Sequence, residues 1–156
     1  MTPKTLQKIL YFIQGFTIAF NKKLLFNDIP QAWAHGPVYP EIYNNYSDFK
    51  FNIIDRTDIA KEEINLNVSD NEKTLIDCIL RFFTRYSGDV LEKITNIEAP
   101  WLNSRVGLAE NESSKNPITL ESMNDYFIQV KNKYNMINYY DIKQYLDDML
   151  NKVACN

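Results

Sequence analysis

The chain has 156 residues, of which 45% are hydrophobic and 24% are charged, and its formal net charge is −3. This length accommodates one domain with its own core, and this composition excludes an intrinsically disordered chain. Affinity for nucleic acid depends largely on Lys and Arg side chains that neutralise phosphates, so the acidic balance argues against DNA or RNA as the main partner.

Neither the cysteines nor the apolar segments indicate export or membrane insertion. Cys78 lies in an apolar run and Cys155 is far from it, so the two thiols do not predict a disulfide framework. No stretch approaches the roughly 18 apolar residues of a membrane helix. We therefore expect a cytoplasmic protein without a membrane partner.

The first predicted element is an amphipathic helix from Thr2-Pro3 to about Asn21, with Thr as N-cap and Pro at the first helical position. Residues 29 to 35 then predict a short extended segment that ends at a Gly36-Pro37 turn. Pro40 suits the first turn of a second helix, which is expected to end near residue 48.

The middle of the chain is irregular before the next clear helix start. Short strands around residues 52–54 and 64–66, or simply a loop, fit its polar sequence with scattered Ile. Ser69 and Glu72 then form a capping-box pattern, and apolar side chains at helical spacing follow as far as Tyr86. This spacing predicts a core helix.

The C-terminal half predicts further helices around a polar loop at residues 110 to 116. Ser87 caps a short helix, Ala99-Pro100-Trp101 begins another turn or helix, and Thr119 caps a longer helix. The last helix, from about residue 139 to 153, carries a full apolar stripe that must pack on something. The chain's own core is favoured, and a partner or a second copy is the alternative. These elements predict a mostly α, compact single-domain helical fold with a small β element.

No set of residues in the sequence indicates catalysis or ion binding. His35 is the only histidine, and no Cys or acidic cluster at ligand spacing surrounds it. We expect it to be structural and bonded to backbone beside the Gly-Pro turn. The four glycines are too dispersed for a phosphate-binding loop. The predictions are no catalytic residue, no metal and no cofactor.

Aromatic side chains are frequent, with ten Tyr, nine Phe and two Trp. Most are expected in the core, because large rings contribute strongly to burial. Tyrosine clusters such as Tyr39 with Tyr43, and Tyr139 with Tyr140, are harder to bury completely. Tyr, Trp and Arg are common at protein–protein hot spots, so some of these side chains are expected to line an interface.

Residues 6–15, residues 32–43 and Pro100-Trp101 with Arg105 resemble three elements of one known family, the Panacea domain of SocA-like antitoxins. Residues 6–15 (LQKILYFIQG) are similar to the family's opening LQKLLYxxQG. Residues 32–43 (AWAHGPVYPEIY) resemble its AWxxGPVxPxxY signature almost position for position. Pro100-Trp101 with Arg105 looks like its PWxxxR element. The family often has His after the Thr equivalent to Thr95; Asn96 stands here, so no role of that histidine carries over.

The resemblance implies a domain division and a function. Residues 1–128 would form the Panacea-like antitoxin domain, and residues 129–156 a C-terminal helical extension packed on or beside it. Such a protein neutralises a cognate toxin by direct contact, without catalysis, and in the SocA branch it also presents the toxin to a ClpXP-type protease. The alternative is a protein of a phage or mobile element that inhibits or remodels a host factor. A homo-oligomer is left open.

Two sets of residues follow from the aromatic content and the resemblance. The first set, expected to contact the partner, consists of Tyr39, Tyr43, Trp101, Arg105, Tyr139 and Tyr140. The second set, expected to maintain the fold, consists of the signature positions Gln14, Gly15, Trp33, His35, Gly36, Pro37, Pro40, Tyr86 and Pro100.

Overall fold

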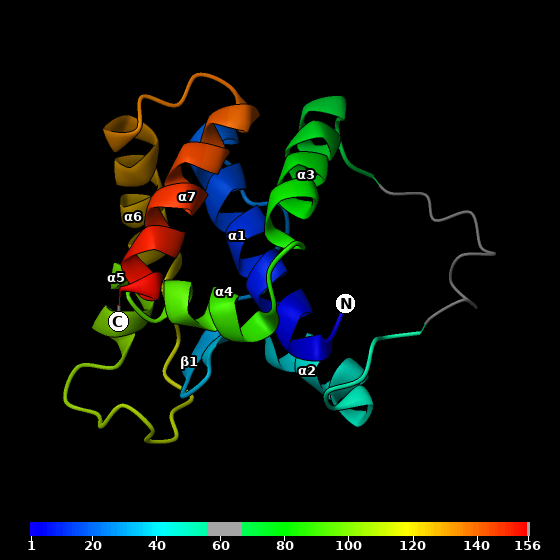
Figure 1. Cartoon of the computed structure of the whole chain (residues 1–156), viewed down its shortest axis with the longest axis vertical. Helices are drawn as coiled ribbons and strands as arrows, with labels where there is room; N and C mark the ends of the chain where they lie inside the picture. The colour runs from blue at the N-terminus through cyan, green and yellow to red at the C-terminus, as the bar shows by residue number, and fades with distance from the viewer. Residues whose placement is uncertain (56–66, 156) are drawn as a thin grey trace.

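The computed structural model describes residues 1–55 and 67–155, and this part of the chain is mostly α-helical (Figure 1). The α-helices are α1 (Pro3–Asn21), α2 (Pro40–Tyr46), α3 (Asp70–Phe83), α4 (Gly88–Thr95), α5 (Ala99–Ser104), α6 (Leu120–Lys133) and α7 (Ile142–Ala154). Short 3₁₀ helices lie at η1 (Ser47–Phe49) and η3 (Tyr139–Asp141), and β1 (Gln31–Trp33) pairs with β2 (Gly36–Val38). The predicted fold class is confirmed.

The predicted helix starts are confirmed by their caps. The hydroxyls of Thr2, Ser69, Ser87 and Thr119 each accept a hydrogen bond from a backbone N–H in the first turn of their helix. The carboxylate of Glu72 accepts from the N–H of Ser69 at 2.7 Å, which completes the predicted capping box. Such caps satisfy donors that the first helical turn leaves unpaired.

Helix α1 is the centre of the core. Every residue from Tyr11 to Ala19 is buried, and α1 packs against α3, α4 and α6 (Figure 1). Gly15 allows the close approach of α6, because a Cβ at this position would lie 2.2 Å from a ring carbon of Phe127. A methyl group there would overpack the contact between the two helices.

The two strands form a tight antiparallel hairpin in which Trp33 lies opposite Gly36. The chain therefore reverses at Ala34 and His35, and the prediction of a Gly36-Pro37 turn is wrong. Gly36 instead begins the returning strand with a φ of 95°, a conformation that L side chains rarely adopt. Residues 52–54 form no strand, and residues 64–66, the other expected strand, lie outside the described residues.

Two glutamines of α1 bind the backbone of the segment that contains the hairpin. Gln7 donates from Nε2 to the carbonyl of Tyr39 (3.1 Å), and its Oε1 accepts from the Tyr39 N–H (2.7 Å). Gln14 repeats this two-way contact with the Phe26 carbonyl (2.6 Å) and the Leu25 N–H (2.9 Å). The amides thus satisfy backbone groups that are costly to bury unpaired.

Lys8 makes a third contact from α1 to the hairpin. Its Nζ donates to the carbonyl of Pro37 at 3.1 Å, and the side chain is almost fully buried. Burial lowers the pKa of Lys8 to about 7, although the nearby carboxylate of Glu92 acts in the opposite direction. A Cβ on Gly36 would lie 2.9 Å from this amine, so glycine leaves room for it. Lys8 is therefore a buried donor to the hairpin.

The apolar stripe of α7 packs into the chain's own core, as the favoured interpretation expected. Ile142, Tyr145, Leu146, Met149 and Val153 are buried, and α7 contacts α3 and α4. No partner is needed to cover this stripe. The domain division at residue 128 stays a prediction.

We expect Gln7→Glu to lower the free energy of unfolding by about 3 kcal/mol, because it replaces the Nε2 donor with an acceptor facing the buried Tyr39 carbonyl. Urea unfolding at neutral pH measures the effect. The exposed position Gln144 on α7 provides the matched control: Gln144→Glu should change stability by less than about 0.5 kcal/mol. Equal stabilities of the two variants would contradict the role of Gln7.

Candidate partner-binding groove

Three of the residues expected to contact a partner are buried within the chain. Tyr39, Trp101 and Arg105 are 1%, 5% and 5% exposed. Tyr39 packs edge-on against Phe26, with ring centroids 5.3 Å apart, and burial raises the pKa of its hydroxyl. Each of the three is enclosed by the fold, and Trp101 and Arg105 line a cavity. Their contact with a partner stays a prediction.

Trp101 and Arg105 fasten the hairpin to α5 and to the loop that follows. Trp101 donates from Nε1 to the carbonyl of Trp33 (2.9 Å), and Arg105 donates from Nη1 to the carbonyl of Ala32 (2.8 Å). The other terminal nitrogen of Arg105 donates to the carbonyls of Ala109, Glu110 and Glu112 at 2.6–3.3 Å. One guanidinium thus joins the hairpin to the loop after α5.

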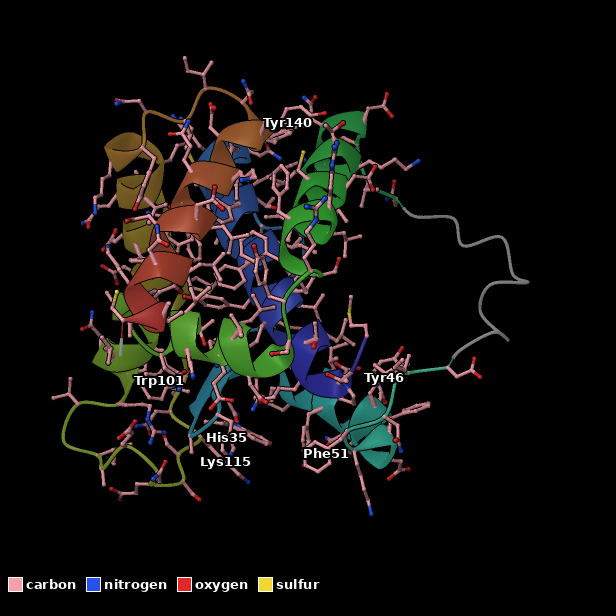
Figure 2. The ribbon with its side chains drawn as sticks, in the orientation of Figure 1. His35, Tyr46, Phe51, Trp101, Lys115 and Tyr140 are labelled. Atoms are coloured by element: carbon pink, nitrogen blue, oxygen red, sulfur yellow. The ribbon has the colours of Figure 1, made fainter. Side chains whose placement is uncertain are left out.

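The other three residues expected to contact a partner are more accessible and lie apart. Tyr43 is partly exposed and packs edge-on against Trp33, with centroids 4.8 Å apart. Tyr139 packs on Phe20, whereas Tyr140 is 59% exposed. In Figure 2 Tyr140 lies near the upper end of the molecule and Trp101 in its lower half. The structure therefore does not bring the six residues together into one surface.

His35 differs from its expected environment. Its ring lies at the exposed turn of the hairpin, and Nδ1 is 3.1 Å from a carboxylate oxygen of Glu92 on α4, not from backbone. Glu92 also pairs with Lys4 of α1. The hairpin turn is thereby tied to α4 through side chains. No group of His, Cys, Asp and Glu among the described residues could hold a metal ion.

The remaining signature residues make contacts within the chain, and their role in maintaining the fold stays a prediction. Pro40 and Pro100 occupy the first turns of α2 and α5. Tyr86 packs, half-buried, against the core, and Trp33 is also half-buried. Gln14 binds the backbone of Leu25 and Phe26, and Gly15 lies against Phe127 of α6. Gly36 and Pro37 lie against Lys8 of α1.

A solvent-open groove lies beside this scaffold, and sequence reasoning missed it. One cavity of about 660 Å³ lies between α4, α5 and the loop after α5, with Trp101, Leu102 and Leu108 in its walls. A second cavity of about 410 Å³ lies between α6 and α7. Ile97 lines both cavities, and we call the two together the Ile97 groove.

Ile97 faces outward because its neighbour is held inward. Glu98 is 1% exposed, and its carboxylate accepts a hydrogen bond from the Tyr11 hydroxyl at 2.9 Å and another from Tyr145. The Tyr126 hydroxyl lies 3.1 Å from that of Tyr145. With Glu98 fixed at the start of α5, the tight turn between α4 and α5 leaves Ile97 38% exposed.

The groove is cationic although the whole chain is acidic. Its lining includes the cations Lys93, Arg105, Lys133 and Lys152 and the anions Glu92 and Glu110. Glu92 is already paired with Lys4, while the ion pairs seen among the described residues do not include Lys93, Arg105 or Lys133. The net charge of the chain is −3, so the positive groove is a local feature.

The fold and the groove define a small helical scaffold that presents one apolar, cationic groove. Residues 6–102 match the family model described as Antitoxin SocA-like, Panacea domain, and this match spans more than half of the chain. The chain belongs to this family. No curated protein and no solved structure matches it. Within the described residues, no helix is long and apolar enough to cross a bilayer.

The buried carboxyl of Glu98 should make the stability of the chain depend on pH. Burial raises the pKa of its carboxyl to about 8, and hydrogen bonds from tyrosines act in the opposite direction. The unfolded carboxyl, with a pKa of about 4.3, loses its proton first, so this group lowers stability as pH rises from 5 to 8. The slope approaches about 1.4 kcal/mol per pH unit for one proton.

Glu98→Gln lacks this titration, so we expect its stability relative to the native chain to increase steadily across that pH range. Urea unfolding of both proteins at pH 5, 6, 7 and 8 measures the difference. A difference that does not change with pH would show that the buried carboxyl is ionised throughout.

Proposed function

We propose that this chain is a non-catalytic antitoxin-type protein that neutralises a cognate toxin by direct contact in the Ile97 groove. The observation that carries the proposal is the exposure of apolar side chains around a cavity in a member of this family. Ile97 and Leu102 are 38% and 46% exposed and flank the buried ring of Trp101. Apolar anchors over a well-packed floor are typical of interface hot spots.

The composition of the groove walls supports a partner-specific role. Helix α4 and residues 99–102 of α5 lie within the part of the chain that matches the family. The opposite walls come from Leu108 to Glu110 and from Val153 of α7, which lie beyond the matched residues. Family members that share the matched helices but differ in the opposite walls could therefore accept different partners.

Two finer proposals come from the family resemblance. The first is that the chain shares the function of the SocA branch and presents its toxin to a ClpXP-type protease in the cytoplasm. The second candidate is a protein of a phage or mobile element that inhibits or remodels a host factor, for which the same groove would serve. Residues 129–156 are proposed as a C-terminal extension of the antitoxin domain.

The test is coexpression with the product of the neighbouring gene. We expect that protein to arrest growth when it is expressed alone, and this chain to restore growth and copurify with it. Ile97→Asp with Leu102→Asp should weaken the complex by a factor on the order of 100, since two apolar anchors become charged. Growth and the dissociation constant of the purified complex are the measurements.

The matched control is Ile137→Asp, at a side chain 88% exposed and absent from both walls of the groove. It should neutralise like the native chain. Thermal melting of each variant separates lost binding from lost folding. Full neutralisation by a folded Ile97→Asp, Leu102→Asp variant would contradict the groove as the toxin site.

A further inference from the structure

One end of the Ile97 groove is cationic, and it lies in the cavity between α6 and α7. Lys133 at the end of α6 and Lys152 on α7 both line the cavity between these helices. Lys152 lies 3.4 Å from Asp148, which also accepts from the hydroxyl of Tyr134. Two lysines thus line this cavity, and Asp148 is the carboxylate paired with one of them. This end of the groove therefore retains positive charge.

The floor of the other cavity adds a cation of a different kind. The Arg105 guanidinium is satisfied by backbone carbonyls, which accept hydrogen bonds but carry no net negative charge. Its centre lies 4.9 Å from the ring centroid of Trp101. Arg105 lines this cavity, and none of the described ion pairs gives it a carboxylate partner.

Because the groove combines apolar surface with positive charge, it should bind a segment that combines apolar side chains with negative charge. We infer that the Ile97 groove receives an acidic, amphipathic segment of the protein partner, with an apolar residue over Ile97 and Leu102 and carboxylates against Lys133 and Lys152. The inference rests on the proposed function, and adds which part of a toxin is recognised. A nucleic acid would use the lysines but leave the exposed Ile97 and Leu102 unmatched, and the chain's net charge of −3 opposes it.

The experiment uses the full chain, and its probe is the neighbouring gene's product from the coexpression experiment. Lys133→Glu with Lys152→Glu should raise the dissociation constant by at least about tenfold at low salt, mainly through slower association. The native complex should weaken between roughly 50 and 300 mM salt because the charges are screened, and the variant should lose that dependence. Lys133→Arg with Lys152→Arg should bind like the native chain.

The matched control is Lys50→Glu with Lys73→Glu, which changes the net charge equally at two exposed residues outside the groove. It should bind within about twofold of the native chain. An equal effect of the two double variants, or none from Lys133→Glu with Lys152→Glu, overturns the inference while the complex itself still supports the proposed function. The absence of any complex overturns both.

Two further outcomes would assign the groove to another occupant. Displacement of the probe by a random-sequence DNA duplex, through the same two lysines, would make it a nucleic-acid site. Concentration-dependent dimerisation of the free chain, abolished by Lys133→Glu with Lys152→Glu, would make it a contact between copies. Either result overturns the inference.

Discussion

The structure depends on hydrogen bonds from helix side chains to the backbone of residues 25–39. The hairpin has only two short strands, and residues 116–118 pair with the outer edge of β1. The backbone groups that these pairings do not reach would be costly to bury unpaired. Gln7, Lys8 and Gln14 satisfy several of these groups from α1, and Arg105 satisfies another from the far end of α5. The hairpin is in this way built into the helical core, although its sequence cannot form a stable sheet alone.

This arrangement gives the family signature a physical meaning. The LQKILYFIQG segment supplies the donors and acceptors, and the AWAHGPVYPEIY segment supplies the backbone that receives them. Gly15 and Gly36 are required where Phe127 and Lys8 approach too closely for a side chain. These contacts favour the prediction that the signature maintains the fold.

The groove lies where this scaffold meets the C-terminal helices. Glu98 is buried among hydroxyls contributed by α1 and α7, and its neighbour Ile97 is turned toward solvent between two cavities. A floor fixed by buried hydrogen bonds requires little reorganisation when a partner binds, which favours affinity. Rigidity of the scaffold and exposure of the groove thus have one structural origin.

The sequence by itself determined the helices, because caps such as Ser69 with Glu72 and apolar spacing are local patterns. It also determined that the stripe of α7 must be covered, and the family resemblance pointed to an antitoxin-like domain. Only the tertiary structure decided which large apolar and aromatic side chains are exposed: Tyr39 and Trp101 are enclosed by segments far away in the chain, whereas Ile97 is exposed. The groove was beyond prediction for the same reason, since Leu102, Lys133 and Lys152 become neighbours of one groove only after four helices pack together.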